Sequence, residues 1–571
     1  MLRHENIKRM FRSSLVVIII ASITGTIGML VDGILIGRYL GSDALAAYGL
    51  ISPAFLILHA VGGVFSSGMQ ALCAGYMGKG KLREANGVFT LTTVLTIGIS
   101  VIFAAGMALF ADPIAAFLGA KGDAAALLPM ARDYLVGLSF GLPMILLHQC
   151  LQPIMQLDGD KGKVIVSTLV MTVADVVGDL LVVHVFEGGM LGMALTTSVS
   201  YLVSMLVYLP HFFRKSSVYR FRLSDVQWSE TLPLLSTGLP TALSRFCNTL
   251  RSLLLNHLLL ALAGSVAVTA LSAQSNMNNF FSSISTGISM STLLVVGVLY
   301  GEEDRDGIRS LLQTALRYGA VLVSIAGAVL GIFAPQFVSL YIQPDDKAYA
   351  MAVECVRIFA FSMPLHALNN VFINYLQGTR NLKRSHLVCA MNELLAIIAS
   401  AYVLGNLFGV RGVWMAFPVG KLLTLVTVFV LACISEKRLP KSTGDFLFLP
   451  KTFDSTPSRE VEVHSASDLQ TLAEAMEDMT AELEYAAVRR SLGAVSDVVE
   501  DVFQEAGSQK APLCVDVRMR VEDDHLRIRI RDNGPAKDRS LALQQMLKGT
   551  GELKYSNTMD TNYLYLTYKA V

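Results

Sequence analysis

Charged residues are scarce in this sequence, and their scarcity excludes an ordinary soluble protein. Asp, Glu, Lys and Arg make up 16% of the 571 residues, against 53% hydrophobic residues and a mean hydropathy of +0.52. A soluble protein carries about 25% charged residues. Because the apolar residues gather in runs of about 20 or more, the sequence predicts a polytopic helical membrane protein.

Cysteine patterns typical of a metal centre or a disulfide framework are also missing. The seven cysteines are scattered, without a CxxC pair or a metal-ligand spacing. Six of them lie in apolar runs, where cysteine behaves as a small core residue. We expect no cleavable signal, because the apolar run Leu15–Gly33 is too long for a signal core.

The hydropathy pattern predicts twelve membrane-spanning helices. They are expected approximately at 14–37, 48–75, 87–110, 133–156, 163–187, 190–212, 231–262, 266–299, 312–334, 354–377, 384–407 and 411–434. Connections rich in Lys and Arg alternate with short or nearly neutral ones, and positive connections stay in the cytoplasm. We therefore expect a multi-pass protein of the cell inner (plasma) membrane with both termini cytoplasmic.

The chain repeats its own motifs at a separation of about 220 residues, and this repeat predicts two bundles of one orientation. Gly188–Val207 is echoed by Phe408–Val428. The predicted fold is an all-α polytopic membrane protein with two six-helix bundles and a small α+β cytoplasmic C-terminal domain. Its parts are expected at 1–212 (N-terminal bundle), 213–230 (cytoplasmic inter-bundle loop), 231–437 (C-terminal bundle) and 438–571 (linker and tail domain).

Two predicted spans carry carboxylates deep in apolar sequence. Asp32 lies about seventeen residues, or roughly 25 Å, into the first apolar run, where a charge is costly unless it is paired, solvated or protonated. Asp175 and Asp179 are spaced i,i+4 and share one helix face, so a shared proton or a bound cation is expected between them. The alternatives are a helix that ends near Asp32 and a purely structural role for the Asp175–Asp179 pair.

Several stretches, in this order, resemble the multidrug and toxic compound extrusion (MATE) family of cation-coupled exporters. They are LVDGILIGRYLGSDALAAYGLISP, SSGMQALCAGYMGKGKLREAN, QPIMQLDGDKGK, GMLGMALTTSVSYLVS and STGLPTALSRF. The resemblance covers roughly residues 10–437. It implies an antiporter, not an enzyme, that exports small organic compounds by alternating access in exchange for Na⁺ or H⁺. No cofactor is required, no nucleic acid is bound, and a monomer in the lipid bilayer is expected.

The resemblance also assigns residues to the coupling site. Asp32, Asp179 and Thr197 match the family's ion-site positions in the first, fifth and sixth spans, and Asp175 stands where relatives usually have an asparagine. A sodium ion at Asp175, Asp179 and Thr197 is one candidate arrangement, and protonation is the other. The first span lacks the proline that bends this helix in some relatives, so a proline hinge is not expected.

Further polar residues are candidates for lining a substrate cavity. They are Gln149, Gln152 and Gln156 on one face of the fourth span, with Arg245, Asn248, Arg251 and Glu393 in the second bundle. Asn248 stands where another MATE branch carries a glutamate, so ion coupling is not expected in this bundle. Glu393 is expected to pair with Arg245 or Arg251, and the alternative is that these arginines attract an anionic substrate.

The tail resembles the ATP-binding domain of the histidine kinase and anti-sigma-factor families. Its pattern is two helices, a hairpin in VDVRMRVEDDHLRIRIRDNG and a closing strand in NYLYLTY. The resemblance makes Asp497, Asp501, Asp532 and Gly534 candidate nucleotide-binding residues, with GTGELK (Gly549–Lys554) as a short trace of a glycine-rich lid. ATP with magnesium, or a regulatory partner protein, is therefore a candidate ligand of the tail.

Two other functions stay open at this point. One is a flippase for a lipid-linked precursor, which would need a strongly cationic cavity. The other is a membrane sensor that signals through the nucleotide-binding-like tail.

Overall fold

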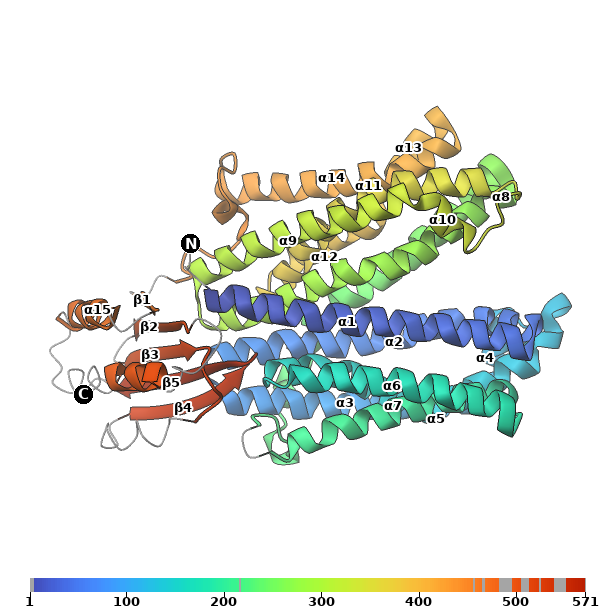
Figure 1. Cartoon of the computed structure of the whole chain (residues 1–571). Coiled ribbons are helices and arrows are strands. Elements are labelled where there is room, and N and C mark those ends of the chain that lie inside the picture. The colour runs from blue at the N-terminus through green and yellow to red at the C-terminus, as the bar shows by residue number, and fades with distance from the viewer. Residues whose placement is uncertain are drawn as a thin grey trace.

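Two helical bundles lie side by side, and a small sheet with its helices lies at one end of both (Figure 1). The computed structural model describes residues 5–214, 217–454, 458–464, 468–481, 495–504, 513–522, 525–538 and 551–569. The first bundle contains α1 (Glu5–Leu35), α2 (Ser42–Gly78), α3 (Leu82–Leu109), α4 (Ala111–Leu118), α5 (Leu128–Leu157), α6 (Lys161–Leu181) and α7 (Gly189–Phe212). The second contains α8 (Thr231–Gly301), α9 (Arg305–Ile332), α10 (Ala334–Ser339), α11 (Tyr349–Gly378), α12 (Leu382–Ala390), α13 (Ala396–Phe408) and α14 (Val410–Glu436).

Eleven helices in the described part of the chain are long and apolar enough to cross a membrane. One of them, α8, reverses direction at Gly264, whose φ of 68° and ψ of −156° interrupt the helix. A straight α8 of 71 residues would be about 105 Å long. Yet Leu234 near its start and Val298 near its end both pack against the last third of α2. The break therefore divides α8 into two antiparallel segments, as the predicted spans 231–262 and 266–299 require.

The bundles meet closely at the sheet end, where glycines bring their backbones together. A Cβ on Gly78 of α2 would lie 2.0 Å from the Val298 carbonyl oxygen, and one on Gly238 would lie 2.0 Å from that of Val64. The hydroxyls of Ser67 and Thr241 are hydrogen-bonded at 2.8 Å across the same contact. Away from the sheet the bundles diverge (Figure 1).

Gly301→Ala tests this close contact. The added methyl would lie 2.1 Å from the Gly75 carbonyl oxygen, so we expect the bundle contact to lose about 1–3 kcal/mol. Spin-label distances between the sheet ends of the two bundles should shift toward a more separated population. Gly98→Ala on α3 is the matched control, because nothing lies within 4 Å of its Cβ position. Unchanged distances in Gly301→Ala would contradict the role of this contact.

The tail forms a five-stranded antiparallel sheet in the order β1-β2-β3-β5-β4. Its strands are β1 (Ser458–Val463), β2 (Val515–Glu522), β3 (His525–Asp532), β4 (Gly551–Thr558) and β5 (Thr561–Lys569). The predicted hairpin is confirmed, because Val515 pairs with Asp532 and Glu522 with His525. Apolar residues of one sheet face pack against helical residues 495–504 and α15 (Leu469–Ala481). Alternate residues of β2 and β3 therefore present a charged second face.

Helix α1 begins at Glu5, nine residues before the predicted span. The extra turns are buried on one side, because Ile7 and Met10 are fully inaccessible to solvent. At its other end α1 continues into a π-helical turn, Ile36–Leu40. α1 therefore ends three residues after Asp32, and the π-helical turn carries the chain on to Leu40. The alternative of a helix that ends near Asp32 stays a prediction.

Candidate functional site

Three carboxylates of the first bundle are buried in the membrane-spanning region. Asp32 lies on α1, and Asp175 and Asp179 lie on α6, which packs against α1. Their exposures are 7%, 8% and 1%, respectively. Each keeps one oxygen without a hydrogen-bond partner within the described residues: Asp32 Oδ1, Asp175 Oδ1 and Asp179 Oδ2. An unpaired buried carboxylate is very costly, so each of these groups is a candidate to hold a proton or a cation.

Hydroxyl groups from α7 approach the two carboxylates of α6. Thr196 Oγ1 donates to Asp179 Oδ1 at 2.5 Å, and Asp175 lies beside Thr197 and Ser200. The structure thus brings Thr197 to Asp175, while its neighbour Thr196 contacts Asp179. Thr196 and Ser200 were not predicted from the sequence. The run of hydroxyl residues in ALTTSVS could have indicated these two residues, because it packs against the span that carries the acids.

Three tyrosines surround the acids from other helices. Tyr48 of α2 lies within electrostatic reach of Asp32, Asp175 and Asp179, and its ring is 5.4 Å from that of Tyr134 on α5. Tyr201 of α7 lies near two of the acids. These phenols supply further oxygens around the acids, and sequence reasoning did not find them because tyrosine is common in membrane spans.

No group of three or more His, Cys, Asp and Glu side chains in the described chain is placed to hold a metal ion. The three aspartates are neighbours in an oxygen-lined region rather than a closed ligand cage. Such a region suits protonation or a monovalent cation held by carboxylate and hydroxyl oxygens. Sodium at Asp175, Asp179 and Thr197 stays a prediction.

The second bundle contains a different kind of polar cluster, in which charges are paired. Arg251 Nη1 donates to Glu393 Oε2 at 2.9 Å, and Arg251 Nη2 donates to Asn248 Oδ1 at 2.8 Å. The structure therefore selects Arg251 as the partner of Glu393. Arg245 has no ion pair among the described residues and lies near His59 of the first bundle.

Lys421 on α14 completes this cluster and was not predicted from the sequence. It is 3% exposed, and its Nζ donates to Asn392 O at 2.8 Å and to Asn392 Oδ1 at 3.1 Å. Asn392 in turn donates to Glu393 Oε1 at 2.7 Å. A lone lysine within the apolar last span was the signal that could have revealed it.

The three glutamines of α5 differ in burial, and their lining of a cavity stays a prediction. Gln149 donates to the His59 carbonyl oxygen at 3.3 Å, whereas Gln156 is 2% exposed and packed inside the bundle. Gln152 between them is half-buried. Helical spacing placed all three on one face, but neighbouring helices cover that face to different degrees.

The candidate nucleotide residues of the tail lie on the helical segment 495–504 and at the end of β3, and Gly534 packs beside Val502 of that segment. Asp497 and Asp501 are exposed on the helical segment 495–504. Asp532 is buried, and its Oδ1 accepts hydrogen bonds at 2.9 Å from both Asn562 Nδ2 and Gly534 N. The start of the proposed lid lies outside the described residues, and its end, Gly551–Lys554, forms the beginning of β4. The side chain of Asn562 thus contacts the aspartate that the resemblance assigns to the adenine.

The similarity to known proteins lies in the two helical bundles. The MatE family profile matches residues 18–181 and 240–402. Multidrug export protein MepA of Staphylococcus saprophyticus is 22% identical over 432 residues, covering 74% of this chain and 94% of that protein. MepA of Staphylococcus aureus strain COL has the same identity and coverage.

Solved structures show the same fold. An outward-facing multidrug resistance MATE family transporter of the MOP superfamily superposes with a TM-score of 0.69 at 20% identity, covering 74% of this chain and 95% of that one. A MOP superfamily transporter from Pyrococcus furiosus, whose binding pocket is described as having reverse polarity, gives a TM-score of 0.70 at 20% identity, with coverages of 76% and 97%.

Proposed function

The chain belongs to the MatE family, and from this membership we propose that it is a cation-coupled antiporter that exports organic, multidrug-type compounds by alternating access. The printed function of the MepA relatives, multidrug export, supports the substrate class. The single observation that supports coupling is the group of three buried aspartates with unpartnered oxygens in the first bundle.

The difference between the bundles supports placing the coupling site in the first one. There, carboxylates are buried beside hydroxyls, and no ion pair joins them to a basic side chain of the described residues. In the second bundle, Glu393 is already ion-paired to Arg251. A group that is paired in the resting protein has little to gain from a cation, whereas an unpaired carboxylate gains most from a proton or Na⁺.

Coupling requires that ion and substrate favour different openings. Only a ligand with different affinities for two conformations shifts the balance between them. The bundles touch at the sheet end and diverge at the other end. This arrangement corresponds to the opening on the side away from the sheet. Binding of a cation at Asp32, Asp175 and Asp179 would change the packing of α1 against α6, and this change would favour one opening over the other.

The membrane potential supplies enough energy for this exchange of ion and substrate. One charge that moves through about 150 mV supplies roughly 3.5 kcal/mol, which supports a substrate gradient of a few hundredfold. The proposed exporter is a monomer of the plasma membrane, with the sheet end in the cytoplasm. It needs no cofactor beyond the exchanged ion, and a nucleotide at the tail is not required for this step.

Flux in proteoliposomes tests the proposal. A fluorescent organic cation loaded inside the vesicles should leave them when a pH gradient or a sodium gradient is imposed. The two gradients should be applied separately to identify the ion. Expected export is at least severalfold faster than leakage from protein-free vesicles. Absence of flux under both gradients, together with ligand-dependent nucleotide binding, would favour the sensor function instead.

A further inference from the structure

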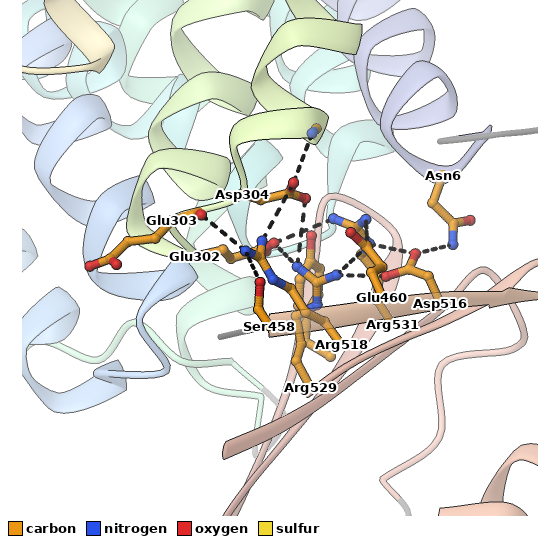
Figure 2. A network of polar contacts seen from close by, with 12 residues as sticks. Asn6, Glu302, Glu303, Asp304, Ser458, Glu460, Asp516, Arg518, Arg529 and Arg531 are labelled. Atoms are coloured by element: carbon orange, nitrogen blue, oxygen red, sulfur yellow. Dashed lines mark hydrogen bonds and ion pairs between the residues drawn. The ribbon is translucent and has the colours of Figure 1, made fainter. Parts of the chain in front are cut away.

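The second face of the tail sheet is built from charged residues, although it is covered. Arg518 and Asp516 of β2 and Arg529 and Arg531 of β3 alternate with the apolar residues of the opposite face. These four side chains are between 1% and 6% exposed. Asn6 of α1 and residues 302–304 of the second bundle lie against them (Figure 2).

The second bundle contacts this face through the connection between α8 and α9, residues 302–304. Arg531 pairs with Glu302 at 3.5 Å, and Arg529 also contacts that carboxylate. Arg518 pairs with Asp304 at 3.4 Å and donates to the Glu303 carbonyl oxygen at 3.0 Å (Figure 2). These pairs are buried from solvent on both sides.

Opposite charges meet within this contact. Three arginines face Glu302 and Asp304 of the connection and Glu460 and Asp516 of the sheet. Burial raises the pKa of Glu460, although Arg529 lies 2.7 Å from its carboxyl group. Asp454 adds a further carboxylate, 2.8 Å from Arg518. Removing this connection from the sheet would leave several buried charges without partners.

The first bundle contacts the same sheet through other connections. The Met559 amide donates to the Leu157 carbonyl oxygen at 3.1 Å, and Lys161 pairs with Asp560 at 3.1 Å. Tyr565 of β5 donates to the Met77 carbonyl oxygen at 3.0 Å. From α1, Asn6 donates to Asp516 at 2.8 Å and Arg9 donates to the Asn533 carbonyl oxygen at 3.3 Å. Most of these contacts are hydrogen bonds rather than ion pairs, and the Asp560 side chain is 47% exposed.

We propose that the tail domain holds the sheet ends of the two bundles together, and that this end opens only when the tail releases the first bundle. The inference rests on the alternating access of the proposed function, in which the sheet ends must separate. One rigid sheet contacts both bundles, so separation must break one set of contacts. The first-bundle contacts break, because they are mainly hydrogen bonds with one ion pair, Lys161–Asp560, whereas buried ion pairs to arginines hold the tail on the Glu302–Asp304 connection.

The test weakens only the first-bundle contacts. Asp560→Asn removes the ion pair with Lys161 and keeps a side chain that tolerates the positive φ of 58° at this position. Tyr565→Phe removes the hydroxyl that donates to Met77. Asp478→Asn with Tyr555→Phe is the matched control, because the hydrogen bonds that it removes, to Arg459 and Asn562, lie within the tail.

A cysteine at the bundle contact reports opening without any need for transport. Ser67→Cys replaces the hydroxyl that faces Thr241, and a membrane-impermeant maleimide is applied from the sheet side in inside-out vesicles. Protein without Ser67→Cys gives the background from native cysteines. We expect labelling to be about three- to tenfold faster in the Asp560→Asn/Tyr565→Phe variant than in the parent and in the control.

Two results would overturn the inference. One is a labelling rate in the test variant equal to that of the parent, and the other is an equal rise in the control. Because labelling needs no substrate or ion gradient, absence of flux would count against the proposed function alone.

Discussion

Asp179→Asn is expected to abolish ion-driven export while the protein still inserts and folds. The amide keeps an oxygen that can accept the hydrogen bond from Thr196, but it cannot bind or release a proton and carries no charge for a cation. Because the substitution removes a buried carboxylate with an unpartnered oxygen, thermal stability should be unchanged or higher. Flux of a fluorescent organic cation in proteoliposomes should fall to the level of protein-free vesicles.

Asp43→Asn is the control for this experiment. It neutralises an acid of the same bundle that is exposed in the first turn of α2, so its flux should match that of the parent. Retained pH- or sodium-driven flux in Asp179→Asn would remove the acid site from the mechanism. A cation titration of Asp32→Asn beside the parent protein, with sodium compared against pH, would then show which ion the site binds.

Glu393→Gln is expected to lower stability by about 3–5 kcal/mol, because it leaves buried cations without a counter-charge. Arg251 lies 2.9 Å from this carboxylate, and Lys421 is held beside it through Asn392. A glutamine can accept hydrogen bonds in the same place, but it cannot balance two cations. The measurement is the thermal unfolding midpoint of the purified protein in detergent.

Glu354→Gln provides the comparison for that variant. Glu354 pairs with Arg411 at 2.7 Å, but the two side chains are 36% and 75% exposed. Loss of such a surface pair should cost less than about 1 kcal/mol. If Glu393→Gln lost transport without losing stability, Glu393 would belong to the transport mechanism instead of to the packing of the second bundle.

The spans, the break at Gly264 and the tail hairpin could be predicted because each depends on a local pattern. Runs of apolar residues indicate spans, and alternation of polar and apolar residues indicates strands. The pair Asp175–Asp179 was likewise predictable, because spacing on one helix fixes a shared face.

Other features depend on contacts between distant segments and could not be predicted. Thr196 was one residue away from the predicted Thr197, and only the packing of α7 against α6 decides which hydroxyl reaches Asp179. Lys421 is 28 residues from Glu393 in sequence, so their cluster appears only when α14 packs beside α12 and the π-helical turn Met391–Leu395. The charged face of β2 and β3 is buried against the bundles, a contact between distant segments that the local alternation of residues does not reveal.

Helix α1 is one unbroken α-helix that carries Asp32 near one end and Asn6 near the other. Asn6 Nδ2 donates to Asp516 of the tail sheet at 2.8 Å, and Arg9 donates to the Asn533 carbonyl oxygen at 3.3 Å. Because α1 contains no proline, an axial displacement at Asp32 would reach Asn6, about 39 Å away, through continuous helical hydrogen bonds. One helix therefore joins a buried carboxylate of the first bundle to the contact between that bundle and the tail sheet.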